Sequence, residues 1–433
     1  MRFEEALSWL SRFEFHGIKP GLSRIYRLLK RLGHPERKFS AVHIAGTNGK
    51  GSTAAFLEAI IRNHGLKTGL YTSPHLNSIC ERFVIAGRPI SSEKFATYCE
   101  VVKKALGSSK ATYFELTTAL AFLAFAQEGV EIAVIECGLG GRLDATNLVR
   151  PEIAIITNIA LDHQAYLGDS LKAIAREKAG IIKRGIPLVL GKILDEPRRV
   201  ILKRARSLKA PVFEYGPDFH ARFEGGKIFY QGQKKFFDLE PALRGCFQAG
   251  NLALALKGAE ILEEKGVLKL EETLVRKGVS SASWPGRFEI FPGQPPLIFD
   301  GAHNLNGIEA LLSALREEGF DSYNLIFAAS DEGGGKPYYE MLKRLLPGAR
   351  KVFLCEPPGP RRPVTLKEWE RWLPAEEINK RFFLCKDPQE ALRKALSQDR
   401  SPLLITGSLY LIGHLRSKLE IEGKTSGKSS KSG

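Results

Sequence analysis

The stretch AVHIAGTNGKGST, residues 41–53, decides the fold of this protein. Its first five residues form a short apolar run typical of a buried strand, and the pattern after it is helical from about Gly51 to His64. A glycine-rich turn lies between them. We expect this turn to bind phosphate, because its glycines let several N–H groups point inward and the helix N-terminus adds positive partial charge.

The turn departs from the strict phosphate-loop pattern G-x-x-x-x-G-K-[ST]. That pattern requires glycine where Ile44 stands, and Gly51 separates Lys50 from Ser52. A glycine-rich turn that binds no nucleotide is therefore an alternative. The strand before the turn and the helix after it favour a nucleotide, with Lys50 reaching the β and γ phosphates and a hydroxyl facing Mg²⁺. The predicted ATP-binding loop residues are Gly46, Thr47, Asn48, Gly49, Lys50, Gly51, Ser52 and Thr53.

The alternation of strand and helix continues along the chain. Short β-rich runs cover residues 132–137, 153–157 and 187–190, with helical segments between and after them. This pattern predicts an α/β fold with an N-terminal P-loop-type domain, whose mostly parallel sheet is covered on both faces. Residues 219–240 differ, because they read as antiparallel hairpins with glycine turns.

A cluster of prolines between Pro285 and Pro296 marks a domain boundary. Beyond it the alternation restarts, which predicts a smaller, Rossmann-like α/β domain. We therefore divide the chain into residues 1–290, residues 291–422 and a tail, residues 423–433. Because the tail contains only Gly, Ser, Lys and Thr, we expect it to be disordered.

The charge balance favours acidic partners, since 64 Lys and Arg stand against 48 Asp and Glu and leave a net charge of +16. Nucleic acid is one such partner, but the basic residues are spread along the chain and no nucleic-acid-binding motif is visible, so we expect none. The six cysteines suggest neither a zinc site nor disulfides. With no signal peptide and no apolar run of about 18 to 20 residues, we expect a cytoplasmic protein that binds no membrane.

A series of motifs resembles the Mur ligase superfamily and, within it, the folylpolyglutamate and dihydrofolate synthases. The loop GTNGKGS is the first, and ECGLGGRLDATN, residues 136–147, is the longest. The others are YTSPHL (71–76), ERF (81–83), TYFE (112–115), DH (162–163), EKAGI (177–181), PGR (285–287) and DGAHN (300–304). The matches run in family order from about residue 20 to residue 304, and the C-terminal third matches in pattern more than in motif.

The resemblance implies a monomeric ligase that uses ATP and Mg²⁺. It would join L-glutamate to the carboxylate of a folate or of dihydropteroate through an acyl phosphate. Its C-terminal domain would close on ATP and glutamate. Whether the enzyme makes dihydrofolate and also extends polyglutamate tails, or only extends tails, stays open. A different Mur-type ligase, acting on a cell-wall precursor or a peptide, and a nucleotide-gated binding protein are the alternatives.

The resemblance also implies roles for individual residues. Three of them, Lys50, Lys178 and His303, are expected to be catalytic, and Asn251, Arg287 and Asp300 are expected to bind ATP together with the loop. The expected Mg²⁺ ligands are Ser52, Ser73, Glu136, His163 and Lys178, the last as a carbamate formed with CO₂. The expected substrate contacts are Arg82, Phe114, Glu115, Leu143, Asp144 and Ala145.

The residues themselves support some of these roles more than others. Glu136 ends an apolar strand before a glycine-rich turn, and open α/β sheets bind ligands at the carboxyl ends of their strands. A capping or ion-pairing glutamate, and a solvated surface lysine at Lys178, are the ordinary alternatives. One segment departs from the family pattern: SDEGGGK, residues 330–336, replaces a short acidic-basic motif and leaves open whether Lys336 approaches ATP.

Overall fold

The computed structural model describes residues 1–14, 19–331 and 337–426. These residues form two compact units. The first comprises Met1–Leu161, Leu167–Ala242 and Gln248–Trp284. The second comprises Asp162–Tyr166, Leu243–Phe247 and the chain from Pro285 onward, and each unit is described by itself below. The domain boundary predicted from the sequence lies after residue 290. Lys336 lies outside the described residues.

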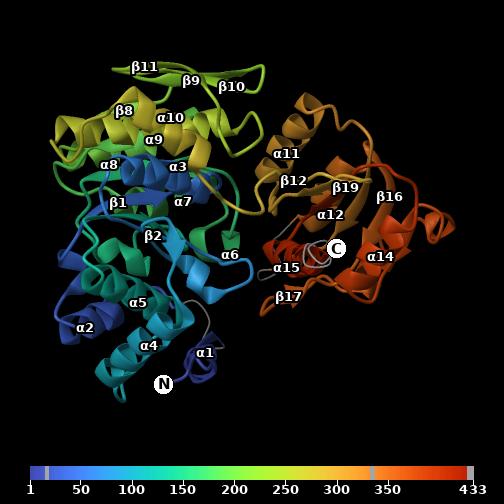
Figure 1. Ribbon diagram of the computed structural model, residues 1–433, viewed down its shortest axis with the longest axis horizontal. Helices are drawn as coiled ribbons and strands as arrows, with labels where there is room; N and C mark the ends of the chain where they lie inside the picture. Colours follow the sequence, from blue (N-terminus) through green and yellow to red (C-terminus); the bar gives the residue numbers. More distant parts are fainter. Residues whose placement is uncertain (15–18, 332–336, 427–433) are drawn as a thin grey trace, which may run out of the picture. The chain divides into compact units, whose positions relative to one another are not determined.

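An eight-stranded sheet in the order β4-β3-β2-β5-β1-β6-β7-β8 forms the centre of the first unit (Figure 1). Within this order, the six strands β2-β5-β1-β6-β7-β8 run parallel to one another. Strands β3 and β4 add an antiparallel edge beside β2. The strands are β1 Ser40–Ala45, β2 Thr68–Tyr71, β3 Phe83–Ile85, β4 Arg88–Pro89, β5 Ile132–Glu136, β6 Ile153–Ile156, β7 Leu188–Leu190 and β8 Val212–Glu214. The predicted α/β class with a mostly parallel sheet is confirmed.

Helices cover both faces of this sheet, as the continuous burial of strands such as β5 and β6 requires. On one face α3 and α9 contact the central strands, and α10 contacts α3. On the other face Ile135 of β5 packs with α5, and Ile156 of β6 packs with α7 and α8. The helices are α1 Phe3–Ser11, α2 Ser23–Arg31, α3 Lys50–Asn63, α4 Ser92–Leu106, α5 Tyr113–Gln127, α6 Gln164–Leu167, α7 Leu171–Lys178, α8 Asp195–Ser207, α9 Gln248–Glu264 and α10 Glu272–Ser281.

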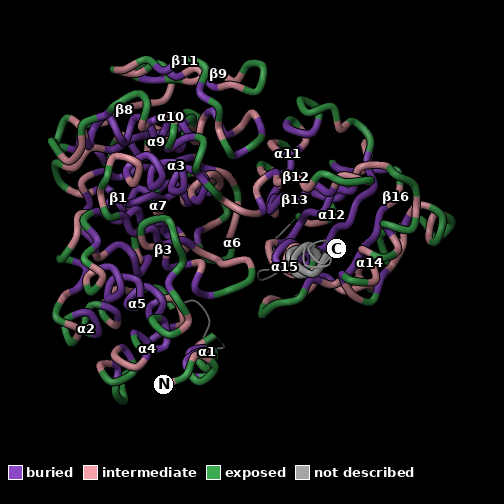
Figure 2. Tube along the Cα trace, viewed as in Figure 1, coloured by how far each residue is buried: buried purple, intermediate pink, exposed green. Residues whose placement is uncertain are grey.

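The helix that follows the phosphate loop is a core helix. Every residue of α3 from Gly51 to Ile61 is buried, and Figure 2 shows this segment within the interior of the first unit. Its position is fixed by small residues, because a Cβ at Gly278 of α10 would lie 2.6 Å from the Cα of Ile60. A helix packed on all sides gives the loop at its N-terminus a rigid base.

The predicted hairpins form a separate three-stranded antiparallel sheet, β9 His220–Glu224, β10 Lys227–Gln231 and β11 Lys235–Leu239. Its inner side packs on α9, where Lys257 and Glu260 form a buried ion pair with 3.0 Å between nitrogen and oxygen. The Lys257 ammonium also lies 4.5 Å from the ring centre of Phe213.

The second unit has a six-stranded sheet in the order β12-β13-β19-β14-β16-β18, with β12 antiparallel to a parallel remainder. Its core contains Ile308 of α11, Phe327 of β14 and Trp369 of α13. The strands are β12 Glu289–Phe291, β13 Leu297–Phe299, β14 Tyr323–Phe327, β16 Ala349–Leu354, β18 Phe382–Leu384 and β19 Leu403–Thr406, and β15 Ser330–Asp331 pairs with β17 Arg362–Pro363. The helices are α11 Leu305–Glu317, α12 Tyr338–Leu345, α13 Leu366–Glu370, α14 Pro388–Leu396 and α15 Leu409–Ser426.

The end of the chain differs from expectation. Helix α15 extends to Ser426, so its last turn lies within residues 423–433, which we expected to be disordered, and that expectation is wrong for residues 423–426. The rest of that tail lies outside the described residues. No helix in the described parts of the chain is both long and apolar enough to cross a membrane.

Candidate active site

The phosphate loop connects β1 to α3 and needs glycine at two positions. Gly46 has φ +156°, and a Cβ there would lie 1.8 Å from Oγ1 of Thr157. Gly49 caps α3 with φ +79°, and a Cβ there would lie 2.3 Å from Oδ1 of Asn251. Larger residues would strain the backbone and displace these neighbours. Asn251 of α9 therefore lies directly against the loop, as its predicted role requires.

Two residues at the end of β6 hold the loop in place. Oδ1 of Asn158 accepts hydrogen bonds from the backbone N–H groups of Thr47 and Asn48, at 3.1 and 2.8 Å. Oγ1 of Thr157 donates to the carbonyl oxygen of Asn48 at 2.6 Å. Because the amides of Thr47 and Asn48 are used inside the protein, the N–H groups nearer the start of α3 are those left to face phosphate oxygens.

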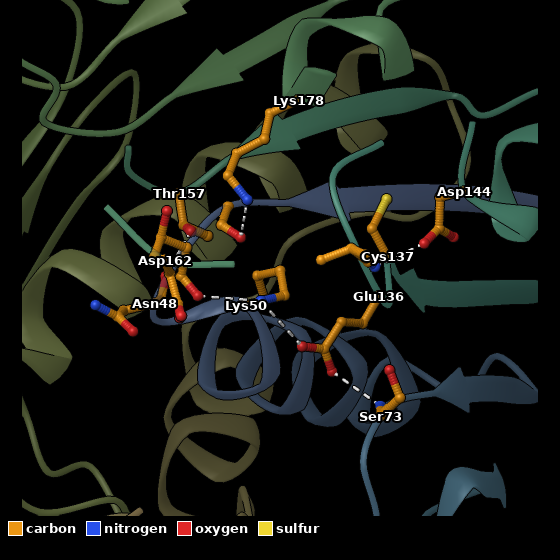
Figure 3. A network of polar contacts seen from close by, with 12 residues as sticks. Asn48, Lys50, Ser73, Glu136, Cys137, Asp144, Thr157, Asp162 and Lys178 are labelled. Atoms are coloured by element: carbon orange, nitrogen blue, oxygen red, sulfur yellow. Dashed lines mark hydrogen bonds and ion pairs between the residues drawn. The ribbon is translucent and has the colours of Figure 1, made fainter. Parts of the chain in front are cut away.

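Lys50 and Glu136 meet beside the loop (Figure 3). Nζ of Lys50 lies 3.7 Å from Oε1 of Glu136 and donates to the carbonyl oxygen of Thr47 at 3.1 Å. The backbone N–H of Ser73 donates to Oε2 of Glu136 at 3.3 Å. The pairing follows from strand order, because β5 lies beside β1 with Glu136 opposite Ile44. Sequence prediction placed Lys50, Ser73 and Glu136 in one site, and the structure brings these three together.

Lys178 reaches the same loop from the other side. It ends α7 with only 4% of its surface exposed, so it is not a solvated surface lysine. Its Nζ donates a hydrogen bond to the carbonyl oxygen of Gly46 at 2.8 Å (Figure 3). A buried ammonium is costly to hold in a protein, which indicates that the position serves the loop.

The donors around Glu136 suit a magnesium ion. No group of three or more His, Cys, Asp or Glu residues among the described residues could hold a metal by itself. Mg²⁺ fits such a place, because it takes one or two carboxylates and completes its shell with substrate phosphates, hydroxyls and water. Glu136 is such a carboxylate at the loop, and the buried Ser52 lies in the first turn of α3. His163, another of the predicted ligands, belongs to the second unit.

The predicted substrate segments pack around Phe114 at the start of α5. A Cβ at Gly138 would lie 2.3 Å from Cζ of Phe114, and the rings of Tyr71 and Phe114 have centroids 6.2 Å apart. Nearby, Nε of Arg82 donates to Nδ1 of His75 at 2.8 Å. Burial, with the charge of Arg82, lowers the pKa of His75 to about 3, so His75 is neutral and accepts this bond.

Glu115 and Asp144 are bound to the protein's own groups. Glu115 forms a capping box with Thr112 at the start of α5 and an ion pair with Arg24 at 3.1 Å. Asp144 accepts from the N–H of Leu139 at 2.7 Å and from the hydroxyl of Thr146 at 2.5 Å. Burial raises the pKa of Asp144, and these hydrogen bonds oppose the rise. Both carboxylates therefore order the segments that carry Phe114, Leu143 and Ala145.

A buried network extends from Asp144 to the strand before the loop. Oγ1 of Thr146 lies 2.8 Å from Nε2 of His43 on β1, and Sγ of Cys137 lies 3.0 Å from the same nitrogen. Burial, with the charge of Lys183, lowers the pKa of His43 to about 3. Neutral His43 thus links β1, the end of β5 and residues 138–147.

The predicted residues of the second unit cluster at the end of β13. Asp300 accepts hydrogen bonds from the N–H groups of Phe288 and Ala302, both at 2.8 Å. Nη1 of Arg287 would lie 2.0 Å from a Cβ at Gly301, so Arg287 packs over this turn. Burial raises the pKa of Asp300, and the positive charge of Arg287 opposes that rise. Asp300 therefore shapes the turn, whatever else it binds.

The segment 162–166 belongs to this cluster as well. Oδ2 of Asp162 accepts from Nδ2 of Asn304 at 2.9 Å and lies 3.7 Å from Nε2 of His303. Nδ1 of His303 lies 2.7 Å from the carbonyl oxygen of Gly301, which makes Nδ1 the protonated nitrogen. His163 follows with a left-handed φ of +50°.

Comparisons with known proteins agree with this geometry. The family descriptions Mur ligase middle domain and Mur ligase, glutamate ligase domain match residues 44–258 and 286–409. The dihydrofolate synthase/folylpolyglutamate synthase of Bacillus subtilis is 36% identical over 96% of this chain and 99% of its own length. The chain belongs to the folylpolyglutamate and dihydrofolate synthases of the Mur ligase superfamily.

Two further relatives support the same assignment. The folylpolyglutamate synthase of Lacticaseibacillus casei is 33% identical over 97% of this chain and 99% of its own length. The solved structure of the Mycobacterium tuberculosis folylpolyglutamate synthase complexed with ADP has a TM-score of 0.85 at 32% identity, covering 96% of this chain and 98% of that one. The predicted family is confirmed, and with it an ATP-dependent ligase.

Sequence reasoning missed several residues of this synthase's site. Thr157 and Asn158, which hold the phosphate loop, directly follow the apolar run 153–156. The available signal was their place after a buried strand, the same signal that singled out Glu136. Arg24 gave no signal, and His75 was noted only as part of the motif YTSPHL, because only the folded chain brings them to Glu115 and Arg82.

Proposed function

We propose that this synthase joins L-glutamate to a folate-type carboxylate by way of an acyl phosphate formed from ATP. The observation that carries the proposal is the pairing of Lys50 with Glu136 at the phosphate loop, 3.7 Å apart, in a chain that spans 99% of the Bacillus subtilis relative. A lysine and a carboxylate at the end of adjacent strands suit a nucleotide triphosphate and its metal ion.

The phosphate loop would bind the triphosphate and position its γ-phosphoryl group. The N–H groups at the start of α3 face the phosphates, and Lys50 turns from the carbonyl of Thr47 to a β- or γ-phosphate oxygen. Asn251, beside Gly49, contacts the nucleotide at the same end of the loop. On the second unit, Arg287 and Asp300 bind ATP, as the family resemblance implies.

Glu136, Ser73 and Ser52 would hold Mg²⁺, and the family resemblance implies His163 as a further ligand. When bound, Mg²⁺ offsets the negative charge that develops on the γ-phosphoryl group. Lys178 would carry a carbamate, which turns a buried cation beside Gly46 into an anion. Support for this comes from its burial and from its place next to the loop. Before CO₂ adds to it, the Lys178 amine stays hydrogen-bonded to the carbonyl oxygen of Gly46.

Two chemical steps follow. A carboxylate oxygen of the folate attacks the γ-phosphorus, the bond from that phosphorus to the β–γ bridging oxygen breaks, and ADP leaves. The amine nitrogen of glutamate then attacks the acyl carbon, the carbon–oxygen bond to phosphate breaks, and the amine loses a proton. His303, whose Nδ1 donates to the carbonyl oxygen of Gly301 and whose Nε2 lies 3.7 Å from Asp162, would contact phosphate or the incoming glutamate.

The folate would lie against the segments of Arg82, Phe114 and residues 143–145. Phe114 offers a ring for a flat heterocycle, and Arg82 offers charge to a carboxylate. We propose that both dihydropteroate and tetrahydrofolate are substrates, because the Bacillus subtilis relative is named for both activities. We further propose a monomer that works in the cytoplasm on small molecules, without nucleic acid or membrane as a partner.

Phosphate release tests this function. The protein, ATP, Mg²⁺ and L-glutamate are combined in parallel with dihydropteroate and with tetrahydrofolate. Release with both would support the bifunctional enzyme, and release with tetrahydrofolate alone would restrict it to tail extension. A folded protein that binds ATP but releases no phosphate with either would overturn the folate assignment in favour of another Mur-type substrate.

A further inference from the structure

The extra glycine of the phosphate loop lies directly against a tryptophan. A Cβ built on Gly51 would lie 2.4 Å from Cζ2, 2.5 Å from Cε2 and 2.6 Å from Nε1 of Trp284. These three atoms form one edge of the indole, so that edge contacts the backbone of Gly51. Real Cβ atoms essentially never approach another atom this closely, and no side chain fits at position 51 while the indole stays.

In this position the indole N–H makes no hydrogen bond to the described residues, although Nε1 is buried. Buried donors are nearly always satisfied in folded proteins, and the exceptions need an explanation. The explanation here is steric, because the N–H edge is the edge that contacts Gly51.

The chain around Trp284 is fixed on one side and leads to the second unit on the other. Before it, α10 packs closely on α3 at Gly278, and Nδ2 of Asn63 donates to Oγ of Ser281 at 3.2 Å. After it, Pro285 begins the second unit. Trp284 is therefore the last residue of the first unit, held against the first turn of α3.

We propose that Trp284 is a positioning residue for the phosphate loop. Its indole edge sets the first turn of α3, and through that turn the neighbours of Gly51, which are Lys50 and Ser52. This accounts for the glycine at position 51, since the residue between the lysine and the serine must lack a side chain. The inference rests on the proposed binding of ATP at this loop.

A double-mutant cycle tests the contact by nucleotide affinity alone. Calorimetry measures binding of the non-hydrolysable analogue AMPPCP with Mg²⁺, without folate or glutamate, to the full chain and to Gly51→Ala, Trp284→Leu and the double variant. We expect about a tenfold loss of affinity in Gly51→Ala, because the added methyl would have to displace the first turn of α3 from the indole. Because Trp284→Leu removes the indole edge, the double variant should bind more tightly than Gly51→Ala. If the loss of affinity in the double variant equals the product of the losses in the two single variants, the proposal is overturned.

Gly278→Ala is the matched control, because its Cβ would also collide with α3, 2.6 Å from the Cα of Ile60. We expect it to lower the melting temperature with little change in affinity for the analogue. An equal loss of affinity in Gly278→Ala would mean that any disturbance of α3 acts on the loop, and would overturn a special role for Trp284. Failure of the unaltered protein to bind the analogue would instead refute the proposed function, and this inference with it.

Fluorescence gives a second test that leaves Gly51 unaltered. The chain has four tryptophans, and the difference in emission between the unaltered protein and Trp284→Phe isolates Trp284. We expect AMPPCP with Mg²⁺ to change the emission of the unaltered protein and not that of Trp284→Phe. An identical change in both would overturn the proposal.

Discussion

Nζ of Lys178, at the end of α7, donates a hydrogen bond to the carbonyl oxygen of Gly46, the first residue of the phosphate loop, over 2.8 Å. The two residues are 132 positions apart in the chain. This contact places a buried amine where the triphosphate and its metal ion are proposed to bind. The chemical state of that amine therefore affects the charge of the site directly.

We predict that Lys178 carries a carbamate in the active enzyme. Removal of CO₂ should lower the rate of phosphate release by about a hundredfold, because the anion would be lost from the metal site, and added bicarbonate should restore it. Carbon-13 NMR with labelled bicarbonate should show a carbamate signal that is absent in Lys178→Arg, which keeps a positive charge near Gly46. Full activity of Lys178→Arg in CO₂-free buffer would refute the carbamate.

Lys50→Ala should abolish ligation and leave the fold intact. Loss of one preorganised positive group at a phosphoryl-transfer site costs on the order of 10²- to 10³-fold in kcat. Phosphate release and thermal melting measure the two effects separately. Lys203→Ala, on the exposed side of α8, is the control for removal of a lysine and should remain active. Near-normal turnover in Lys50→Ala would contradict the interpretation of the loop.

The fold class could be predicted, because each strand of a parallel sheet is a continuous apolar run. The family could be predicted from the order of the motifs along the chain. This order also placed Lys50, Ser73 and Glu136 in one site. The order of the strands in the sheet could not be predicted. Parallel strands are joined by crossover connections, and no local sequence pattern shows beside which strand the next one pairs. β1 lies between β5 and β6, and that position alone brings Asn158 to the loop.

Other contacts could not be predicted for a different reason. Gly51 looked like an irregularity of the loop, and only the folded chain shows that Trp284, far away in sequence, occupies the space of its side chain. Glu115 and Asp144 looked like substrate contacts, yet their carboxylates bind groups of the protein. A motif marks such residues as necessary without saying whether they touch the substrate or order the segment that does.

The buried His43 predicts a pH dependence of stability. Its pKa is about 3 in the folded protein, against 6.5 for a free histidine, so below about pH 6.5 the unfolded chain binds a proton that the folded chain does not. Stability should therefore fall as the pH decreases from 6.5 toward 3, by about 1.4 kcal/mol per pH unit for this one proton. His75 has the same sign and adds to the slope.

Denaturant unfolding between about pH 4.5 and 6 measures this slope. His43→Asn should lower stability overall, because the contacts with Thr146 and Cys137 change, but its stability should depend less steeply on pH. His220→Asn, at an exposed position of β9, should keep the slope of the unaltered protein. Equal slopes in all three proteins would show that His43 takes up its proton without unfolding.

Asn158→Ala should weaken nucleotide binding without removing any group that we expect to touch the nucleotide. The change deletes two hydrogen bonds to the loop amides of Thr47 and Asn48, each contributing about 0.5–1.5 kcal/mol. It frees the N–H of Asn48 to turn, whereas the N–H of Thr47 keeps its bond to the backbone carbonyl oxygen of residue 158 at 3.1 Å. We expect the Kd for AMPPCP to rise about tenfold by calorimetry, because part of the binding energy must then reorder the loop. Asn63→Ala, at the other end of α3, loses bonds to Ala59 and Ser281 and should bind the analogue normally. If Asn158→Ala also bound it normally, the glycines, Thr157 and the backbone carbonyl of residue 158 would suffice to order the loop, and the Asn158 side chain would have no part in preparing the site.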